Sequence, residues 1–203
     1  MVKGECRVEQ DVKQRILLAA KELFAVQGFD GTTIRQICDK ANANISLISY
    51  YFGGKDKVFQ HIFETYFPGN RLDQAEHYFR DPLSGLQFLM DQIMAMSFND
   101  SHLSLIIDQE LLMRSPRSEI VMSYVQPVWS KLEELLQRGK EQGVFHFDSL
   151  AHTLVIIRGI SLSGKIDLKA NMHAPPKSQE ETTQIKQAAI QFIMRGLKVE
   201  TAE

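Results

Sequence analysis

The feature that most constrains the fold is the helical spacing of apolar residues along almost the whole chain. Apolar side chains recur at intervals of three and four residues, and no segment of any length alternates with the two-residue period of a strand. The predicted helices cover residues 11–27, 32–41, 44–52, 55–66, 83–97, 103–113, 118–142, 150–160 and 182–199. Pro127 is expected to kink or divide the seventh, Asp148 to cap the eighth, and residues 164–181 to form an irregular connector. The sequence therefore predicts an all-α protein.

Composition places the chain among ordinary folded proteins. Of its 203 residues, 44% are hydrophobic and 24% are charged, which excludes disordered and fibrous classes. No apolar run approaches the roughly 18 residues of a membrane span, and the N-terminus lacks the apolar core of a secretion signal. Two cysteines do not suggest a disulfide framework. We expect a cytoplasmic protein without a membrane segment.

The charge is unevenly distributed along the chain. Residues 1–60 hold nine Lys and Arg against seven Asp and Glu, a net charge of +2. The remaining residues hold fourteen against eighteen, a net charge of −4. Any surface that contacts phosphate is therefore expected within the first sixty residues.

Short capping signals divide these sixty residues into separate helices. Thr32-Thr33 can cap a helix, and Asn42 can adopt the left-handed conformation that a tight turn needs. Asn44 can cap a second short helix, which Gly53-Gly54 ends. Together with the preceding helix, this pattern predicts a tri-helical helix-turn-helix unit.

The same residues resemble the TetR family of transcriptional regulators. The resemblance rests on Leu23-Phe24, Gly28-Phe29, Thr32 to Ile37, Ala41 and Ile48 to Phe59, in order and at family spacing. It implies an N-terminal helix-turn-helix DNA-binding domain over residues 1–55 and a helical ligand-binding and dimerisation domain over residues 56–203. It also implies a homodimeric repressor that binds a palindromic DNA operator and is released by a small-molecule effector, without a cofactor.

The residue types suit DNA contact. A hydroxyl at a helix start, phenol groups and a lysine can all bind phosphate, which indicates Thr33, Tyr50, Tyr51 and Lys55. By family analogy, base contacts are assigned to Arg35, Asn44, Ile45, Ser46 and Leu47.

Two positions depart from the family pattern. Asn42 replaces the usual Gly, which the turn tolerates, and Ile45 stands where a polar residue is common. On a helical wheel Ile45 falls beside Ile48 and Phe52 on the buried side, whereas the family alignment favours a contact with a thymine methyl group. We favour the base contact slightly, with Leu47 as the safer apolar contact.

Structural alternatives remain for several of these residues. Tyr51 is expected to pack partly inward, which makes Tyr50 the better exposed contact. Lys55 is either a phosphate contact or an ordinary solvated lysine. Arg35 can pair with Asp39 four residues on, at only about 0.3–0.5 kcal/mol, and can still switch to DNA.

The candidate ligand-binding residues lie on later apolar stripes. They are Met90, Met94, Ile107, Glu110, Met113 and Arg158. The core is the favoured position for the methionines, although their flexible thioether groups also suit an adaptable pocket. Glu110 can anchor an effector or pair with Arg114, the second being favoured, and Arg158 can line a pocket or a dimer contact.

Other functional classes find little support. None of the six histidines forms an HxxxH or HExxH pair, so no metal site is expected, and no catalytic motif indicates an enzyme. Small residues in the last helix, Ala188, Ala189 and Gly196, predict a dimer through the last two helices. The alternative function is a helical small-molecule binding protein that does not bind DNA.

Overall fold

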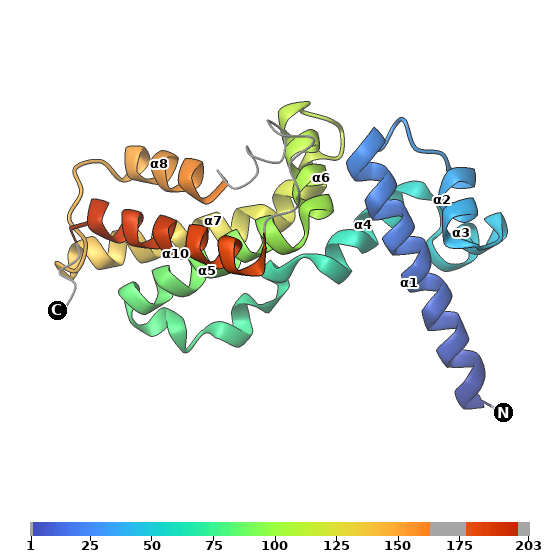
Figure 1. The fold of residues 1–203 in the computed structure, drawn as a ribbon, viewed down its shortest axis with the longest axis horizontal. Coiled ribbons are helices and arrows are strands. Elements are labelled where there is room, and N and C mark those ends of the chain that lie inside the picture. The colour runs from blue at the N-terminus through green and yellow to red at the C-terminus, as the bar shows by residue number, and fades with distance from the viewer. Residues whose placement is uncertain (1, 163–177, 199–203) are drawn as a thin grey trace. The chain divides into compact units, whose positions relative to one another are not determined.

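The computed structural model describes residues 2–162 and 178–198, and all its regular elements there are helices (Figure 1). In chain order these are α1 Val2–Gln27, α2 Ile34–Ala41, α3 Ile45–Phe52, α4 Lys55–Tyr66, the short 3₁₀ helices η1 Pro68–Ala75 and η2 Tyr78–Arg80, α5 Pro82–Asn99, α6 Ser101–Leu112, α7 Ser118–Glu141, α8 Leu150–Leu162 and α10 Gln179–Gly196. The predicted all-α class is confirmed. Within the described ranges, no helix is long and apolar enough to cross a membrane.

The chain divides into two compact units. Unit 1 comprises Met1–Phe67 and His102–Tyr124, and unit 2 comprises Pro68–Ser101 and Val125–Glu203. The helix-turn-helix segment therefore shares a unit with most of α6 and with the start of α7. The functional boundary at residue 55 stays a prediction.

The capping signals of unit 1 act as the sequence predicts. The Thr33 hydroxyl accepts a hydrogen bond from Gln36 N, and the Gln36 side chain accepts one from Thr33 N, which forms a capping box at the start of α2. Asn42 ends α2 in the left-handed conformation at φ 48°. The Asn44 side chain caps α3, and Gly53 ends α3 at φ 80°. Both short helices are thus closed by local hydrogen bonds.

Unit 1 is built around an aromatic cluster. Phe59 of α4 is fully buried, and its ring lies 6.0 Å from Phe24, 5.6 Å from Phe29 and 5.2 Å from Phe63, measured between centroids. α1 packs against α2 and α4, and α3 packs against both α2 and α4. The cluster fixes the frame on which α2 and α3 are held.

Unit 2 has an aliphatic core between α5, α7, α8 and α10. Asp81 caps α5 by accepting a hydrogen bond from Ser84 N at 2.8 Å, and this bond holds the pKa of Asp81 below its usual value. Pro82 follows in the first turn of α5, where its missing N–H has no consequence. α5 contacts both α8 and α10, and α8 and α10 contact each other. Buried core residues include Leu86, Leu89, Met90, Met94, Leu132, Leu135, Leu136, Phe145, Leu154, Ile157, Ile193 and Met194.

Three predictions about helix starts are wrong, and Pro127 does not divide the helix that contains it. α1 begins at Val2, well before Asp11, and α7 continues through Pro127 from Ser118 to Glu141. α8 is capped by Ser149, whose hydroxyl accepts from His152 N at 3.3 Å, and not by Asp148. Residues 164–181 are not wholly irregular, because α10 starts at Gln179. Residues 164–177 of the expected connector lie outside the described ranges.

α10 starts earlier than predicted because of a second capping box. The Ser178 hydroxyl accepts from Glu181 N, and the Glu181 carboxylate accepts from Ser178 N at 2.9 Å. This is the Ser-x-x-Glu pattern of a helix start, and it precedes the apolar stripe beginning at Ile185 that predicts the later start.

Candidate nucleic-acid interface

The short helix α3 presents a polar first turn. Asn44 and Ser46 are both exposed, and the Asn44 Oδ1 accepts from Ser46 N at 3.0 Å and from Ser46 Oγ at 2.9 Å. The Asn44 amide N–H₂ group is not needed for the cap. The cap therefore orients the Asn44 side chain and leaves donors for a contact beyond the helix.

The outward side of α3 differs from the helical-wheel expectation. Ile45 is 51% exposed and Tyr50 is 76% exposed, whereas Leu47 is half-buried. Ile48 and Phe52 form the buried side, as predicted. The burial of Ile45 inferred from periodicity is wrong, and Ile45 is a more accessible apolar side chain than Leu47. Ile45 is the first residue of α3 and stands between the exposed residues Asn44 and Ser46.

Tyr51 packs partly inward, as expected, and one contact that holds it was not anticipated. Its ring is half-buried, with the Tyr50 ring 5.0 Å away, and the Lys13 Nζ of α1 lies over it at 4.8 Å from the centroid. Lys13 is itself exposed, so α1 adds a positive charge beside α3. Sequence reasoning missed Lys13 because no local motif links it to residues nearly forty positions later.

Arg35 and Thr33 stand at the start of α2. The Arg35 side chain is 82% exposed, and its Nε lies 3.9 Å from the carboxylate of Asp39, so the predicted ion pair is present but loose. A pair this exposed contributes little and leaves Arg35 able to contact another group. The Thr33 hydroxyl already forms hydrogen bonds with Gln36. The backbone N–H groups at the N-terminus of α2 are therefore the donors that remain at this point for an anion.

Lys55 has a structural role that neither sequence interpretation anticipated. Its Nζ donates to Phe29 O at 2.9 Å and to Thr32 O at 2.8 Å, and it lies 4.2 Å from the centroid of the Phe29 ring. The ammonium group is therefore not merely solvated. With three donors in all, one donor of Lys55 is left for a phosphate.

An ion pair between Glu22 and Lys40 links α1 to α2. Lys40 Nζ lies 2.6 Å from Glu22 Oε1, and this hydrogen bond lowers the pKa of Glu22. The turn after α2 is closed by a hydrogen bond from Ala43 N to Cys38 O at 3.0 Å, and α2 packs against α3. The exposed side chains thus belong to short helices with fixed mutual positions.

The predicted ligand-binding residues are divided between the two units. In unit 1, Ile107 and Glu110 are buried, whereas Met113 is 79% exposed. Glu110 and Met113 line an open cavity of about 360 Å³ between the end of α1 and the turn after α6. Glu110 forms an ion pair, as favoured, but with Arg117 and not with the expected Arg114. The backbone explains this difference, because Arg114 lies after the end of α6 at φ 47°.

In unit 2, Met90 and Met94 are fully buried core residues. The guanidinium carbon of Arg158 lies 4.8 Å from the centroid of the Trp129 ring, and its buried Nε has no hydrogen-bond partner among the described residues. A ligand role for these three residues stays a prediction. Among the described residues, no group of three His, Cys, Asp or Glu side chains is arranged to hold a metal ion.

Comparison with known proteins agrees with this geometry. The family described as "Bacterial regulatory proteins, tetR family" matches residues 16–62, which span the C-terminal part of α1, all of α2 and α3, and most of α4. The "Probable HTH-type transcriptional regulator YttP" of Bacillus subtilis (strain 168) is 25% identical over 73% of this chain and 74% of its own length. The "HTH-type transcriptional repressor NicS" of Pseudomonas putida is 27% identical over 73% of both chains.

A solved structure extends the match beyond the helix-turn-helix. The crystal structure of HlyIIR, a hemolysin II transcriptional regulator, aligns with 95% of this chain and 99% of its own, with a TM-score of 0.73 and 26% identity. These relatives are regulators and not enzymes. Residues 16–62 therefore form a helix-turn-helix of the tetR family, and the chain is similar over most of its length to transcriptional regulators.

Proposed function

We propose that this chain is a homodimeric repressor that binds a near-palindromic DNA operator in the cytoplasm and is released by a small-molecule effector. Phosphate contacts come from Thr33, Tyr50, Tyr51 and Lys55, with base contacts from Arg35, Asn44, Ile45, Ser46 and Leu47. The domain division at residue 55 belongs to this proposal. The named repressor function of the relative NicS supports the direction of regulation.

The observation that carries the proposal is the outward side of α3. Side chains that pack no core, Ile45 and Tyr50, stand beside the exposed Ser46 on a helix closed at both ends. Burial of large apolar and aromatic side chains would be favourable, yet here they are exposed to solvent. A short rigid helix with this surface fits the major groove, where Ile45 can contact a thymine methyl group and Tyr50 a phosphate.

Release by an effector requires two conformations with different operator affinity. An effector that prefers the conformation with the wrong spacing of recognition helices lowers the fraction bound to DNA. Candidate effector contacts are Met90, Met94 and Arg158 in unit 2 and Ile107, Glu110 and Met113 in unit 1. The chemical class of the effector is a question for native mass spectrometry of the purified protein.

Tyr50→Ala is expected to weaken operator binding by about tenfold, which corresponds to the loss of one good contact to a charged phosphate. The measurement is fluorescence anisotropy on DNA from the intergenic region next to the gene. Tyr50→Phe separates the phenol group from the ring and should account for most of the loss.

Tyr78→Phe is the matched control, because Tyr78 is also an exposed tyrosine, at 43%, but lies in unit 2. It should bind the operator as the wild type does. Tyr50→Ala with unchanged affinity would remove Tyr50 from the interface, and affinity that does not fall with added salt would favour the alternative without DNA function.

The dimer surface is proposed on α8 and α10. Val155 is 69% exposed, Ile156 is 59% exposed and Phe192 is 66% exposed within the single chain. Gly159 lies on the same side of α8 as Val155 and Ile156, and a side chain added there would meet open space. Apolar groups of this size exposed together are typical of an interface between subunits.

Val155→Glu combined with Phe192→Glu is expected to convert the dimer to a monomer, because two charges would be buried without partners on each side of the interface. Sedimentation velocity at micromolar concentration measures this. Leu112→Glu, at another exposed apolar residue, should remain dimeric. A wild-type monomer at this concentration would contradict the assignment.

Gly159→Ala tests the same interface independently, through the sign of its effect on stability. In a free helix the change raises stability by about 0.5–1 kcal/mol. If a partner helix packs closely on Gly159, the added methyl group instead weakens the dimer.

A further inference from the structure

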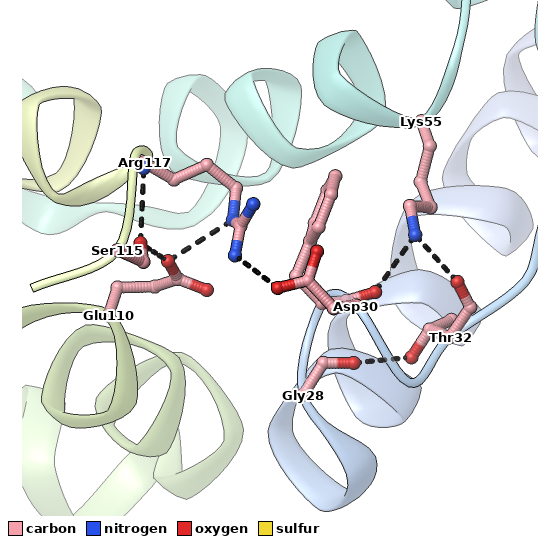
Figure 2. Close-up of polar contacts among 8 residues, drawn as sticks. Gly28, Asp30, Thr32, Lys55, Glu110, Ser115 and Arg117 are labelled. Carbon is pink, nitrogen blue, oxygen red and sulfur yellow. Dashed lines mark hydrogen bonds and ion pairs between the residues drawn. The ribbon is translucent and has the colours of Figure 1, made fainter. Parts of the chain in front are cut away.

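Within unit 1, a single arginine joins the turn after α6 to the turn between α1 and α2 (Figure 2). Arg117 Nη2 lies 3.1 Å from Asp30 Oδ2, and Arg117 Nε lies 3.1 Å from Glu110 Oε2. The guanidinium carbon also lies 4.0 Å from the centroid of the Phe29 ring. Asp30 and Arg117 are 87 positions apart in sequence.

The α1–α2 turn is the segment that starts the helix-turn-helix. On it, Thr32 Oγ1 donates to Gly28 O at 2.7 Å, and Thr33 then caps α2. Lys55 holds the same turn through the carbonyl groups of Phe29 and Thr32. The position of α2, and with it Arg35, therefore depends on a turn that two later cations contact, Lys55 of α4 and Arg117 of the turn after α6.

The two ionic links of Arg117 differ in environment. The Glu110 side chain is 6% exposed and the Arg117 side chain is 12% exposed, whereas the Asp30 side chain is 84% exposed. Glu110 is held further by the Ser115 hydroxyl, which in turn accepts from Arg117 N at 3.0 Å. A buried carboxylate cannot lose its cation without a large desolvation penalty, but an exposed one can. Arg117 is therefore bound firmly to the end of α6 and loosely to Asp30.

This asymmetry is suited to a switch. The open cavity of about 360 Å³ is lined by Asp30, Glu110 and Arg117, so the guanidinium group has space to move away from Asp30. Glu110 lies on the buried side of α6 with Ile106 and Ile107, so a shift of α6 carries Glu110 and Arg117 with it. Of the two links, the one to the exposed Asp30 costs less to break.

We propose that Arg117 is a positioning residue that couples α6 to the α1–α2 turn, and that its release from Asp30 loosens the start of α2. The consequence for operator binding rests on the proposed function. The coupling itself is a property of unit 1 and is testable without DNA.

Hydrogen–deuterium exchange on the DNA-free protein tests the coupling. Asp30→Asn should speed exchange across residues 28–36 by about two- to fivefold, the range of a weak exposed ion pair. Arg117→Met together with Glu110→Gln, which leaves no unpaired buried charge, should speed it further. Exchange in α4 and α7 should not change.

Arg114→Met is the matched control, because Arg114 is an exposed arginine three residues away. It should leave residues 28–36 at the wild-type rate. The coupling is overturned if Asp30→Asn and the double variant exchange as the wild type does, or if Arg114→Met gives the same increase.

Operator binding supplies the second readout. Asp30→Asn should bind the specific operator about three- to tenfold more weakly, while binding to unrelated DNA is unchanged or slightly tighter because a negative charge is lost. Equal changes on both DNAs would mean a charge effect and overturn the positioning role. If the wild type binds no operator although the exchange pattern holds, the proposed function fails and the coupling stands.

Discussion

Phe59→Ala should lower the free energy of unfolding by about 3–5 kcal/mol, the range for a large aromatic side chain removed from a core. Phe59 is fully buried, and its ring packs against those of Phe24, Phe29 and Phe63, which belong to α1, the α1–α2 turn and α4. The cavity left behind would open the centre of unit 1. Urea unfolding followed by far-UV circular dichroism measures the change.

Phe59→Leu is the control for this prediction. It retains most of the apolar volume and should cost clearly less than the alanine variant, because little cavity remains. Phe29 also receives the cations of Lys55 and Arg117, so loss of its packing partner should reach the α1–α2 turn. We therefore expect Phe59→Ala to reduce operator binding even at temperatures where the chain remains folded. Equal stability of the alanine and leucine variants would contradict this role of the cluster.

The second large effect is expected at Gly139 in α7. A methyl group on Gly139 would overlap the ring of Phe145, which is only 1% exposed. The Gly139 carbonyl group also accepts hydrogen bonds from Val144 N at 2.8 Å and Phe145 N at 3.1 Å, so the chain is held close to the helix here. Gly139→Ala should destabilise unit 2 by about 1–3 kcal/mol, even though alanine favours a helix.

A double-mutant cycle isolates the cause. In a Phe145→Ala background the overlap disappears, and Gly139→Ala should then be neutral or stabilising by about 0.5–1 kcal/mol. The fluorescence of the single tryptophan, Trp129, which also lies in α7, provides the unfolding signal. An unchanged cost in the Phe145→Ala background would show that the ring is not responsible.

Local hydrogen bonding explains which features were predicted correctly. Thr33, Asn42, Asn44 and Gly53 act within five residues of their partners, and each ends or begins a helix as its residue type predicts. The same reasoning misplaced the cap of α8, because Ser149 and Asp148 are adjacent residues that can both cap a helix. Local chemistry determines that a helix starts, but not always at which of two neighbours.

The candidate interface was predicted in part. The exposure of Tyr50 and the inward packing of Tyr51 follow from the spacing of apolar residues in α3. The relative exposure of Ile45 and Leu47 does not, because a helical wheel gives the direction of a side chain but not the neighbours that cover it. Those neighbours are set by where α2 and α4 pack on α3.

The sequence by itself determined the helical class and the helix-turn-helix, because these depend on apolar periodicity and on contacts between near neighbours. Its motifs also carried the resemblance to the tetR family. Only the tertiary structure decided the partners of the charged groups. Glu110 pairs with Arg117 and not Arg114, Lys55 binds the α1–α2 turn, and Lys13 lies over Tyr51. Long charged side chains reach whichever partner the packed helices bring close, and that choice is made by the buried aromatic core and not by sequence separation.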